Sequence, residues 1–232
     1  MTIKIEIIQD LDNLYTRAME IIEAELENGS TTFGLATGGT MEPLYAKLRE
    51  SSLDFSRCTS FNLDEYVGLH TSHPESYSFF MKKQLFDVKP FAQSFLPNGE
   101  ALDVALEAKV YEDKLNCNRL DFQLLGVGVN GHIGFNEPGT SFHSFTHVVE
   151  LTESTRKANA RFFDSIEEVP KKAITMGIAS ILKARSILLI AIGEKKRHAL
   201  EQLLTGQKTE QVPVTALIDH PNVIVLTDIQ LN

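Results

Sequence analysis

The segment Gly126–Gly139 constrains the fold more than any other part of the chain. It follows an apolar run at 122–125 and brings together glycines, asparagines, one histidine and one carboxylate. A short apolar run predicts a buried parallel strand, whereas the glycine-rich segment after it can continue neither as a helix nor as a strand. We therefore expect a stiff polar loop at the carboxyl end of a strand, from which His132 and Glu137 face a ligand.

The same segment also matches the dinucleotide-binding fingerprint Gly-x-Gly-x-x-Gly. The glycines are Gly126, Gly128 and Gly131, and Glu150 lies near the distance expected of a ribose-binding acid. That fingerprint places its third glycine inside a helix, which Pro138 and the further glycines of this segment would break. The pattern therefore favours an active-site loop, with nucleotide binding as the weaker alternative.

Composition limits the class of protein. A chain of 232 residues can bury a large core, and we expect residues 1–232 to form a single domain. Cys58 and Cys117 are the only cysteines, which is typical of the reducing cytoplasm. The net charge of -9 disfavours nucleic acid and anionic membranes as partners. The N-terminus has no signal-peptide pattern, and no apolar run is long enough to span a bilayer.

Strand patterns alternate with helix patterns along the chain. This alternation predicts an α/β fold with a Rossmann-like open sheet, mostly parallel, and helices on both faces. The expected strands are 3–8, 32–37, 59–63, 94–96, 121–126, 146–151, 186–192, 212–218 and 223–226. The expected helices are 11–26, 42–49, 77–85, 102–115, 153–163, 177–182 and 194–204.

A second glycine turn, Gly38-Gly39-Thr40, joins the strand at 32–37 to the helix at 42–49. Free amides at a helix N-terminus, together with the hydroxyls of Thr37 and Thr40, would suit a phosphate group. The segment is not a Walker motif, because the Gly-Lys-Ser/Thr signature is missing. From these residues alone, anion binding and a plain tight turn remain equally good interpretations.

Charged residues follow two further strands. Asp64 and Glu65 come after the strand at 59–63, where a carboxylate either caps a helix or acts in a site. The residues 72–75 have capping-box spacing and predict their own helix start, which leaves Asp64 on a loop at the ligand-binding edge. Lys196 falls in the first turn of the helix at 194–204, where a cation opposes the helix dipole unless an anion lies between them.

Five motifs of this chain resemble those of the glucosamine-6-phosphate deaminase family. They are LATGGT (35–40), FNLDEYVG (61–68), HPESY (73–77), GHIGFNEP (131–138) and TRKANARFF (155–163). They occur in order and with suitable spacing from about residue 32 to residue 196. The resemblance implies conversion of D-glucosamine 6-phosphate and water to D-fructose 6-phosphate and ammonia, without a cofactor or metal.

The resemblance also implies roles for individual residues. Asp64 would be the base that moves hydrogen from C2 to C1. His132, oriented by Glu137 and Asn130, would move protons during ring opening, since an imidazole exchanges protons near neutral pH. The residues expected to bind the sugar phosphate are Thr37, Gly38, Gly39, Thr40, Gly126, Gly134, Arg161 and Lys196.

Two departures from the family bear on assembly and control. Some relatives have aspartate at the position of Asn130, and regulated hexameric relatives continue beyond residue 232. Relatives that N-acetylglucosamine 6-phosphate activates have an arginine and a lysine at the positions of His147 and Val149. Because neither residue here is a permanent cation, we expect hyperbolic kinetics and a monomer or small homo-oligomer. Two other functions remain as alternatives to the deaminase: a 6-phosphogluconolactonase-like hydrolase and a non-catalytic sugar-phosphate sensor on the same fold.

Overall fold

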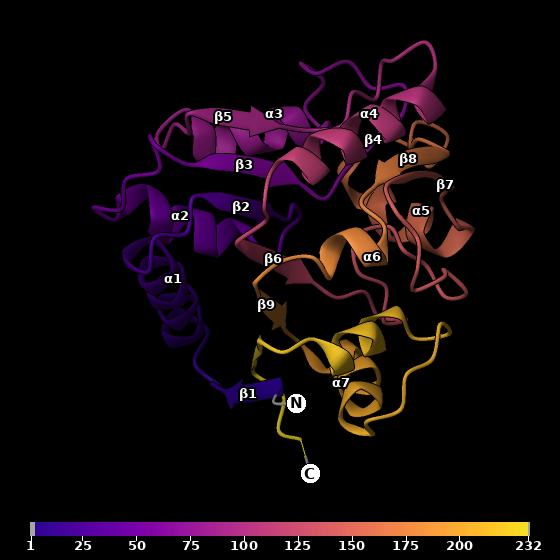
Figure 1. Cartoon of the computed structure of the whole chain (residues 1–232). Helices are drawn as coiled ribbons and strands as arrows, with labels where there is room; N and C mark the ends of the chain where they lie inside the picture. Colours follow the sequence, from indigo (N-terminus) through magenta and orange to yellow (C-terminus); the bar gives the residue numbers. More distant parts are fainter. Residues whose placement is uncertain (1–2, 232) are drawn as a thin grey trace.

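Parallel strands form the centre of the molecule. The computed structural model describes residues 3–231, apart from the side chains of residues 154, 158 and 162. Within that range a seven-stranded sheet has the order β1-β10-β9-β6-β2-β3-β5, and each neighbouring pair is parallel (Figure 1). Its strands are β1 (Ile3–Ile7), β2 (Thr32–Leu35), β3 (Thr59–Asn62), β5 (Gln93–Phe95), β6 (Phe122–Gly126), β9 (Ser186–Ala191) and β10 (Val223–Thr227). The predicted α/β fold with a mainly parallel sheet is confirmed.

Helices cover both faces of this sheet, as predicted. In Figure 1, α1 and α2 lie on one side, whereas α4, α6 and α7 lie on the other. The helices are α1 (Leu11–Glu27), α2 (Glu42–Glu50), α3 (Tyr77–Met81), α4 (Val104–Cys117), α5 (Glu153–Asn159), α6 (Ile178–Ile181) and α7 (Arg197–Leu204). A π-helical segment, Lys82–Phe86, continues α3, and 3-10 turns continue α5 (Ala160–Phe162) and precede α7 (Glu194–Lys196). Aspartates begin the two longest helices, since Asp10 caps α1 and Asp103 caps α4 through their carboxylates.

A second, antiparallel sheet lies beside the first and has the order β4-β8-β7. It consists of β4 (Asp64–Tyr66), β8 (Lys172–Thr175) and β7 (His147–Glu150). Leu63 joins the two sheets: its amide donates to Leu35 of β2 at 3.0 Å, and its carbonyl accepts from Met176 at 2.7 Å. Asp64 therefore lies in a short strand opposite Thr175, and the expectation that it lies on a loop was wrong.

Two further expectations about local structure were wrong. Residues 212–218 form no strand, because a 3-10 helix spans Pro213–Asp219 and a proline at its start has no N–H for a ladder. The apolar run there is buried on all sides, so its composition resembled that of a strand. The helix α3 begins at Tyr77, as predicted, but its N-cap is Ser76, whose hydroxyl accepts from the amide of Phe79, and not the capping box predicted at residues 72–75.

One continuous hydrophobic core runs from Leu14 in α1 to Ile229 after β10. Its centre is formed by the fully buried strands β6 and β9, as their uninterrupted apolar sequences predicted. Among the described helices, none combines the length and apolar character needed to cross a bilayer.

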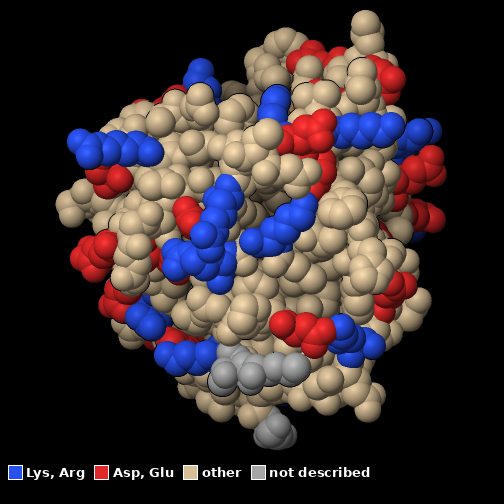
Figure 2. All heavy atoms as spheres, viewed as in Figure 1, with Lys and Arg blue, Asp and Glu red and all other residues tan. Residues whose placement is uncertain are grey.

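Surface charge is mixed in sign despite the net charge of -9. On the face drawn in Figure 2, acidic and basic side chains alternate, and Lys and Arg side chains gather near its middle. Local groups of cations can therefore attract an anionic ligand even though the net charge of the protein is negative.

Gly177, at the start of α6, packs closely against the backbone of the segment before β7. A Cβ atom at Gly177 would lie 2.2 Å from the carbonyl oxygen of Ser144 and 2.3 Å from that of Phe145. Backbone atoms cannot rotate away, so we expect Gly177→Ala to lower the free energy of unfolding by about 2 kcal/mol or more in urea denaturation. Gly39→Ala, which meets no atom within 4 Å, is the control and should change it little. Equal stability of the two variants would contradict this account of the packing.

Candidate active site

The predicted site residues lie at one edge of the large sheet. Because all of its strands are parallel, the segments that follow β2, β3, β6 and β9 emerge at the same edge. After β2, the strands β3 and β5 lie on one side of it in the sheet. After β6, the strands β9 and β10 lie on the opposite side. The neighbours β2 and β6 thus mark the point where the strand order reverses, which is where open α/β sheets bind ligands.

The glycine turn after β2 has the shape expected of an anion-binding loop. Gly38 has a φ of +97°, and its carbonyl accepts from the amide of Met41 at 2.9 Å. The hydroxyl of Tyr15, in α1, holds the turn by donating to the carbonyl of Thr40 at 2.8 Å. Helix α2 then begins without a side-chain cap, so no capping side chain accepts from its first amides.

The turns after β2 and β6 lie against each other. A Cβ atom at Gly126 would be 3.3 Å from the terminal methyl of Met41, which follows Thr40 directly. The glycine at this position therefore leaves room for the Met41 side chain beside the end of β6. Thr37 immediately precedes the turn and is partly exposed.

Arg161 and Lys196 come together from distant parts of the sequence. Arg161 lies on the 3-10 turn after α5, and Lys196 lies on the one before α7. Burial lowers the pKa of Lys196, and the positive charges of Arg161 and Lys195 lower it further. Neighbouring cations of this kind are stabilised when an anion binds between them.

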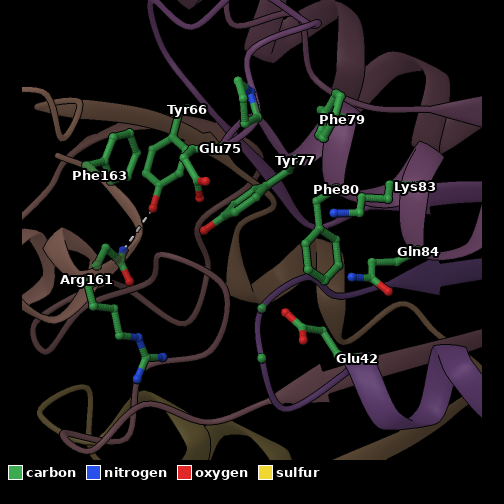
Figure 3. A pocket seen from close by; sticks show the side chains of 14 residues that line it. Glu42, Tyr66, Glu75, Tyr77, Phe79, Phe80, Lys83, Gln84, Arg161 and Phe163 are labelled. Carbon is green, nitrogen blue, oxygen red and sulfur yellow. Dashed lines mark hydrogen bonds between the residues drawn. The ribbon is translucent and has the colours of Figure 1, made fainter.

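A cavity of about 290 Å³ adjoins the anion-binding turn. Gly38, Gly39 and Arg161 line one part of it, and Figure 3 shows Tyr66 and Tyr77 above Arg161. Burial raises the pKa of Tyr66 to about 12, and the charge of Asp64 adds to the effect. The charge of Asp64 also raises the pKa of Tyr77, which lines the same cavity, although burial is the larger cause.

Asp64 and Glu65 are adjacent buried carboxylates that differ in their hydrogen bonding. Glu65 accepts hydrogen bonds from the amides of Tyr66, Tyr77 and Ser78 at 2.8 to 2.9 Å, so it anchors the start of α3. Asp64 is 6% exposed, and burial, with the charge of Glu65 second, raises its pKa to about 8. The capping interpretation therefore holds for Glu65, whereas the carboxylate of Asp64 is more basic than an exposed one.

Glu137, Asn130 and His132 form a directed hydrogen-bond chain. The amide nitrogen of Asn130 donates to Glu137 Oε2 at 2.7 Å, so the amide oxygen of Asn130 faces His132 Nδ1, also at 2.7 Å. An oxygen there can only accept, which assigns the proton to Nδ1 and leaves a lone pair on Nε2. Glu137 also accepts from the hydroxyl of Thr155.

The charge state of His132 suits a group that takes up a proton. Burial lowers its pKa, the charge of Glu137 opposes that effect, and the charge of Lys196 adds to it. The imidazole is thus mainly neutral near pH 7, with Nε2 able to accept a proton. The positive charge of Lys196 therefore acts on the imidazole.

Two glycines of the loop provide space for these side chains. A Cβ atom at Gly128 would lie 2.2 Å from Cε1 of His132, so any other residue there would displace the ring. A Cβ atom at Gly134 would lie 2.9 Å from the hydroxyl of Thr175 and 3.5 Å from Oδ2 of Asp64. Asp64 and the loop that carries His132 are therefore neighbours.

Sequence reasoning gave no role to Thr155 or to Gly128. Thr155 was part of a quoted motif, but a threonine in a helix gives no sign of the carboxylate that it will meet. Gly128 was considered only for the dinucleotide fingerprint. The loop continues without a helix after Gly131, so the structure does not have the arrangement that this fingerprint requires.

Comparison with known proteins establishes the family of the chain. The family model described as glucosamine-6-phosphate isomerases/6-phosphogluconolactonase matches residues 7–225. The chain belongs to this family. A glucosamine-6-phosphate deaminase of Lysinibacillus sphaericus is 63% identical over 206 residues, which cover 89% of this chain and 93% of that protein. The corresponding protein of Lactobacillus johnsonii is 52% identical over 225 residues, covering 96% and 94% of the two chains.

Solved structures extend the comparison to the fold of the family. A monomeric glucosamine-6-phosphate deaminase superposes with a TM-score of 0.94 at 44% identity and covers 97% of each chain. A 6-phosphogluconolactonase of Thermotoga maritima superposes with a TM-score of 0.78 at 17% identity, covering 97% of this chain and 99% of that one. The second likeness establishes the fold alone.

The buried carboxyl of Asp64 should cost stability at high pH. Its pKa is raised to about 8 in the folded chain, so the cost is absent below the ordinary carboxyl pKa, grows as pH rises toward 8, and is constant above it. We expect Asp64→Asn to be more stable than the wild type by a few kcal/mol at pH 9. The difference should shrink toward pH 5 in urea denaturation. A difference independent of pH would show that Asp64 is not desolvated in the folded state.

Proposed function

We propose that this protein converts D-glucosamine 6-phosphate and water to D-fructose 6-phosphate and ammonia. One observation carries the proposal: a buried carboxylate, Asp64, lies next to a loop whose imidazole, His132, is held in one tautomer. Both are on the sheet edge that also carries the anion-binding turn. Relatives 63% and 52% identical to this chain are named glucosamine-6-phosphate deaminase, which supports the same reaction.

Ring opening is the step that His132 would perform. The C1 hydroxyl of the sugar loses its proton, the bond from C1 to the ring oxygen breaks, and the ring oxygen gains a proton. Nε2 of His132 has the lone pair to receive the first proton and can return it to the ring oxygen. Glu137, through its charge, stabilises the imidazolium that exists between the two transfers.

Hydrogen transfer between carbons is the step that Asp64 would perform. In the open-chain amino aldose, the carboxylate removes the proton from C2, and the resulting enolamine receives a proton at C1. The product is an imine at C2, which water converts to the ketone with release of ammonia. A carbon-bound proton is weakly acidic, so a carboxylate whose pKa is raised to about 8 by burial is a better base than an exposed one.

Phosphate binding would fix the flexible open-chain sugar against these groups. We propose that the amides of the 38–40 turn, with Thr37 and Thr40, hold the phosphate together with Arg161 and Lys196. The mutual influence of the two cations and the position of Arg161 beside Gly38 and Gly39 support this assignment. Gly126 and Gly134 would let the loop backbone approach the sugar hydroxyls.

A 6-phosphogluconolactonase-like hydrolase is the second candidate, because the family includes such enzymes and they share the fold. Hydrolysis of a lactone needs activated water but no base for a carbon-bound proton, so the buried Asp64 favours the deaminase. Purified protein should release ammonia from glucosamine 6-phosphate and leave 6-phosphogluconolactone at its uncatalysed rate. The reverse result would identify a lactonase, and binding without turnover of either would identify a sensor.

We further propose that the protein acts in the cytoplasm as a monomer or small homo-oligomer. The compartment is supported by Cys58 and Cys117, which are both free thiols. A monomeric relative at 44% identity supports a simple assembly. His147 and Val149 both lie in β7, and neither is a permanent cation. That N-acetylglucosamine 6-phosphate does not activate the protein stays a prediction.

Asp64→Asn should lower kcat by about a thousandfold, because the amide cannot accept a proton from carbon. Calorimetric titration with glucosamine 6-phosphate should still give a Kd within a few-fold of the wild-type KM. Asp113→Asn, a change of the same kind on the exposed face of α4, is the matched control and should keep full activity. Substantial turnover by the Asp64 variant would overturn its assignment as the base.

Arg161→Ala and Lys196→Ala should chiefly raise KM for glucosamine 6-phosphate. Each removes a charge-assisted contact worth about 2 kcal/mol, which is roughly thirtyfold in kcat/KM. Lys195→Ala removes an exposed cation from the same turn as Lys196 and should have a much smaller effect. Unphosphorylated glucosamine should be turned over equally by all of these variants; if its turnover fell as sharply, the residues would not be phosphate ligands.

A further inference from the structure

The short helix α5 contacts the active-site loop through a buried hydroxyl. Thr155, in the first turn of this helix, is 7% exposed and donates a hydrogen bond to Glu137 Oε1. Thr152 caps the helix, and its hydroxyl accepts from the amide of Thr155 at 3.2 Å. A second contact further along the helix, from Asn159 to the Tyr66 hydroxyl at 2.9 Å, is the dashed line in Figure 3. The backbone position of Thr155 is therefore well determined relative to Glu137.

The two oxygens of Glu137 have different donors. Oε2 accepts from Asn130, which in turn orients His132, whereas Oε1 accepts from Thr155. A carboxylate held at one oxygen alone can turn about its terminal bond, whereas one held at both oxygens is fixed. The hydroxyl of Thr155 thus restricts the rotation that would move Oε2 away from Asn130.

We propose that Thr155 is a positioning residue for the imidazole. It fixes Glu137, Glu137 fixes the amide of Asn130, and that amide keeps the proton of His132 on Nδ1. An amide oxygen and an amide nitrogen are nearly the same size, so their partners decide which of them faces the ring: Glu137 accepts from the nitrogen, and the backbone amide of His132 donates to the oxygen at 3.2 Å. Loss of the hydroxyl would weaken the constraint from Glu137 and let the amide and the tautomer vary more, so that Nε2 would carry a proton for part of the time. The inference rests on the proposed function for its effect on catalysis, but the tautomer itself is independent of the substrate.

Two variants at one position separate this role from simple packing. Thr155→Val keeps the shape of the side chain and loses the hydroxyl, whereas Thr155→Ser keeps the hydroxyl and loses a methyl group. We expect the valine variant to lower kcat by about ten- to a hundredfold with KM changed less than about threefold. The serine variant should retain kcat within about threefold. A packing role would instead make both variants less stable and leave kcat of the folded fraction unchanged.

Nitrogen NMR of the labelled imidazole gives a readout that does not depend on turnover. The wild type and the serine variant should show His132 with the proton on Nδ1, and the valine variant should show shifts averaged between the two tautomers. Wild-type kcat and a single tautomer in Thr155→Val would overturn the inference. A wild-type protein that releases no ammonia but shows the expected tautomers would contradict the proposed function and leave the positioning role of Thr155 supported.

Discussion

The pairing of β2 with β6 at the centre of the sheet determines where the site lies. Phe33 pairs with Phe122 and Gly34 with Gln123, and both strands are covered by helices. Parallel pairing makes the two strands end together, so a turn suited to an anion and a loop suited to proton transfer become neighbours. Apolar burial of the strands maintains this arrangement without any contact between the reacting groups themselves. The chemistry can therefore vary within the family while the edge of the sheet stays in place.

Asp64 and Glu65, the adjacent carboxylates after β3, differ in their hydrogen bonds, and this difference gives one a structural role and the other a raised pKa. Glu65 receives several amide donors and holds α3, whereas Asp64 faces Thr175 and the loop at Gly134. A desolvated carboxyl lowers the stability of the chain at neutral pH and above, and that cost is the reason it is a strong base. Leu63, hydrogen-bonded to both sheets, carries the backbone between these environments.

Much of this arrangement could be predicted from the sequence, and the failures have physical causes. The buried strands β6 and β9 and the glycine turn after β2 have strong local patterns, so their positions were predicted correctly. At Pro213–Asp219 the proline is a local sign against a strand, but the apolar composition of the run outweighed it in the prediction. The strand of Asp64 depends on pairing with β8, which lies far away in the sequence and which no local pattern records. The same limit applies to Thr155, since its partner Glu137 lies on another element. The roles of the individual site residues remain predictions, which the experiments above address.

The glycines of the Gly126–Gly139 loop provide space for side chains as well as freedom for the backbone. The sequence predicted a stiff polar loop from which His132 and Glu137 face a ligand. In the structure, the space that a side chain at Gly128 would occupy holds the His132 ring, and the space at Gly134 borders Asp64. Absence of a Cβ atom thus lets two functional side chains approach the backbone, and Gly134, with a φ of +56°, also needs the conformation that glycine adopts easily. It follows that substitution at Gly128 displaces the imidazole directly, whereas the turn at Gly38 tolerates a side chain sterically and is limited by its φ of +97°.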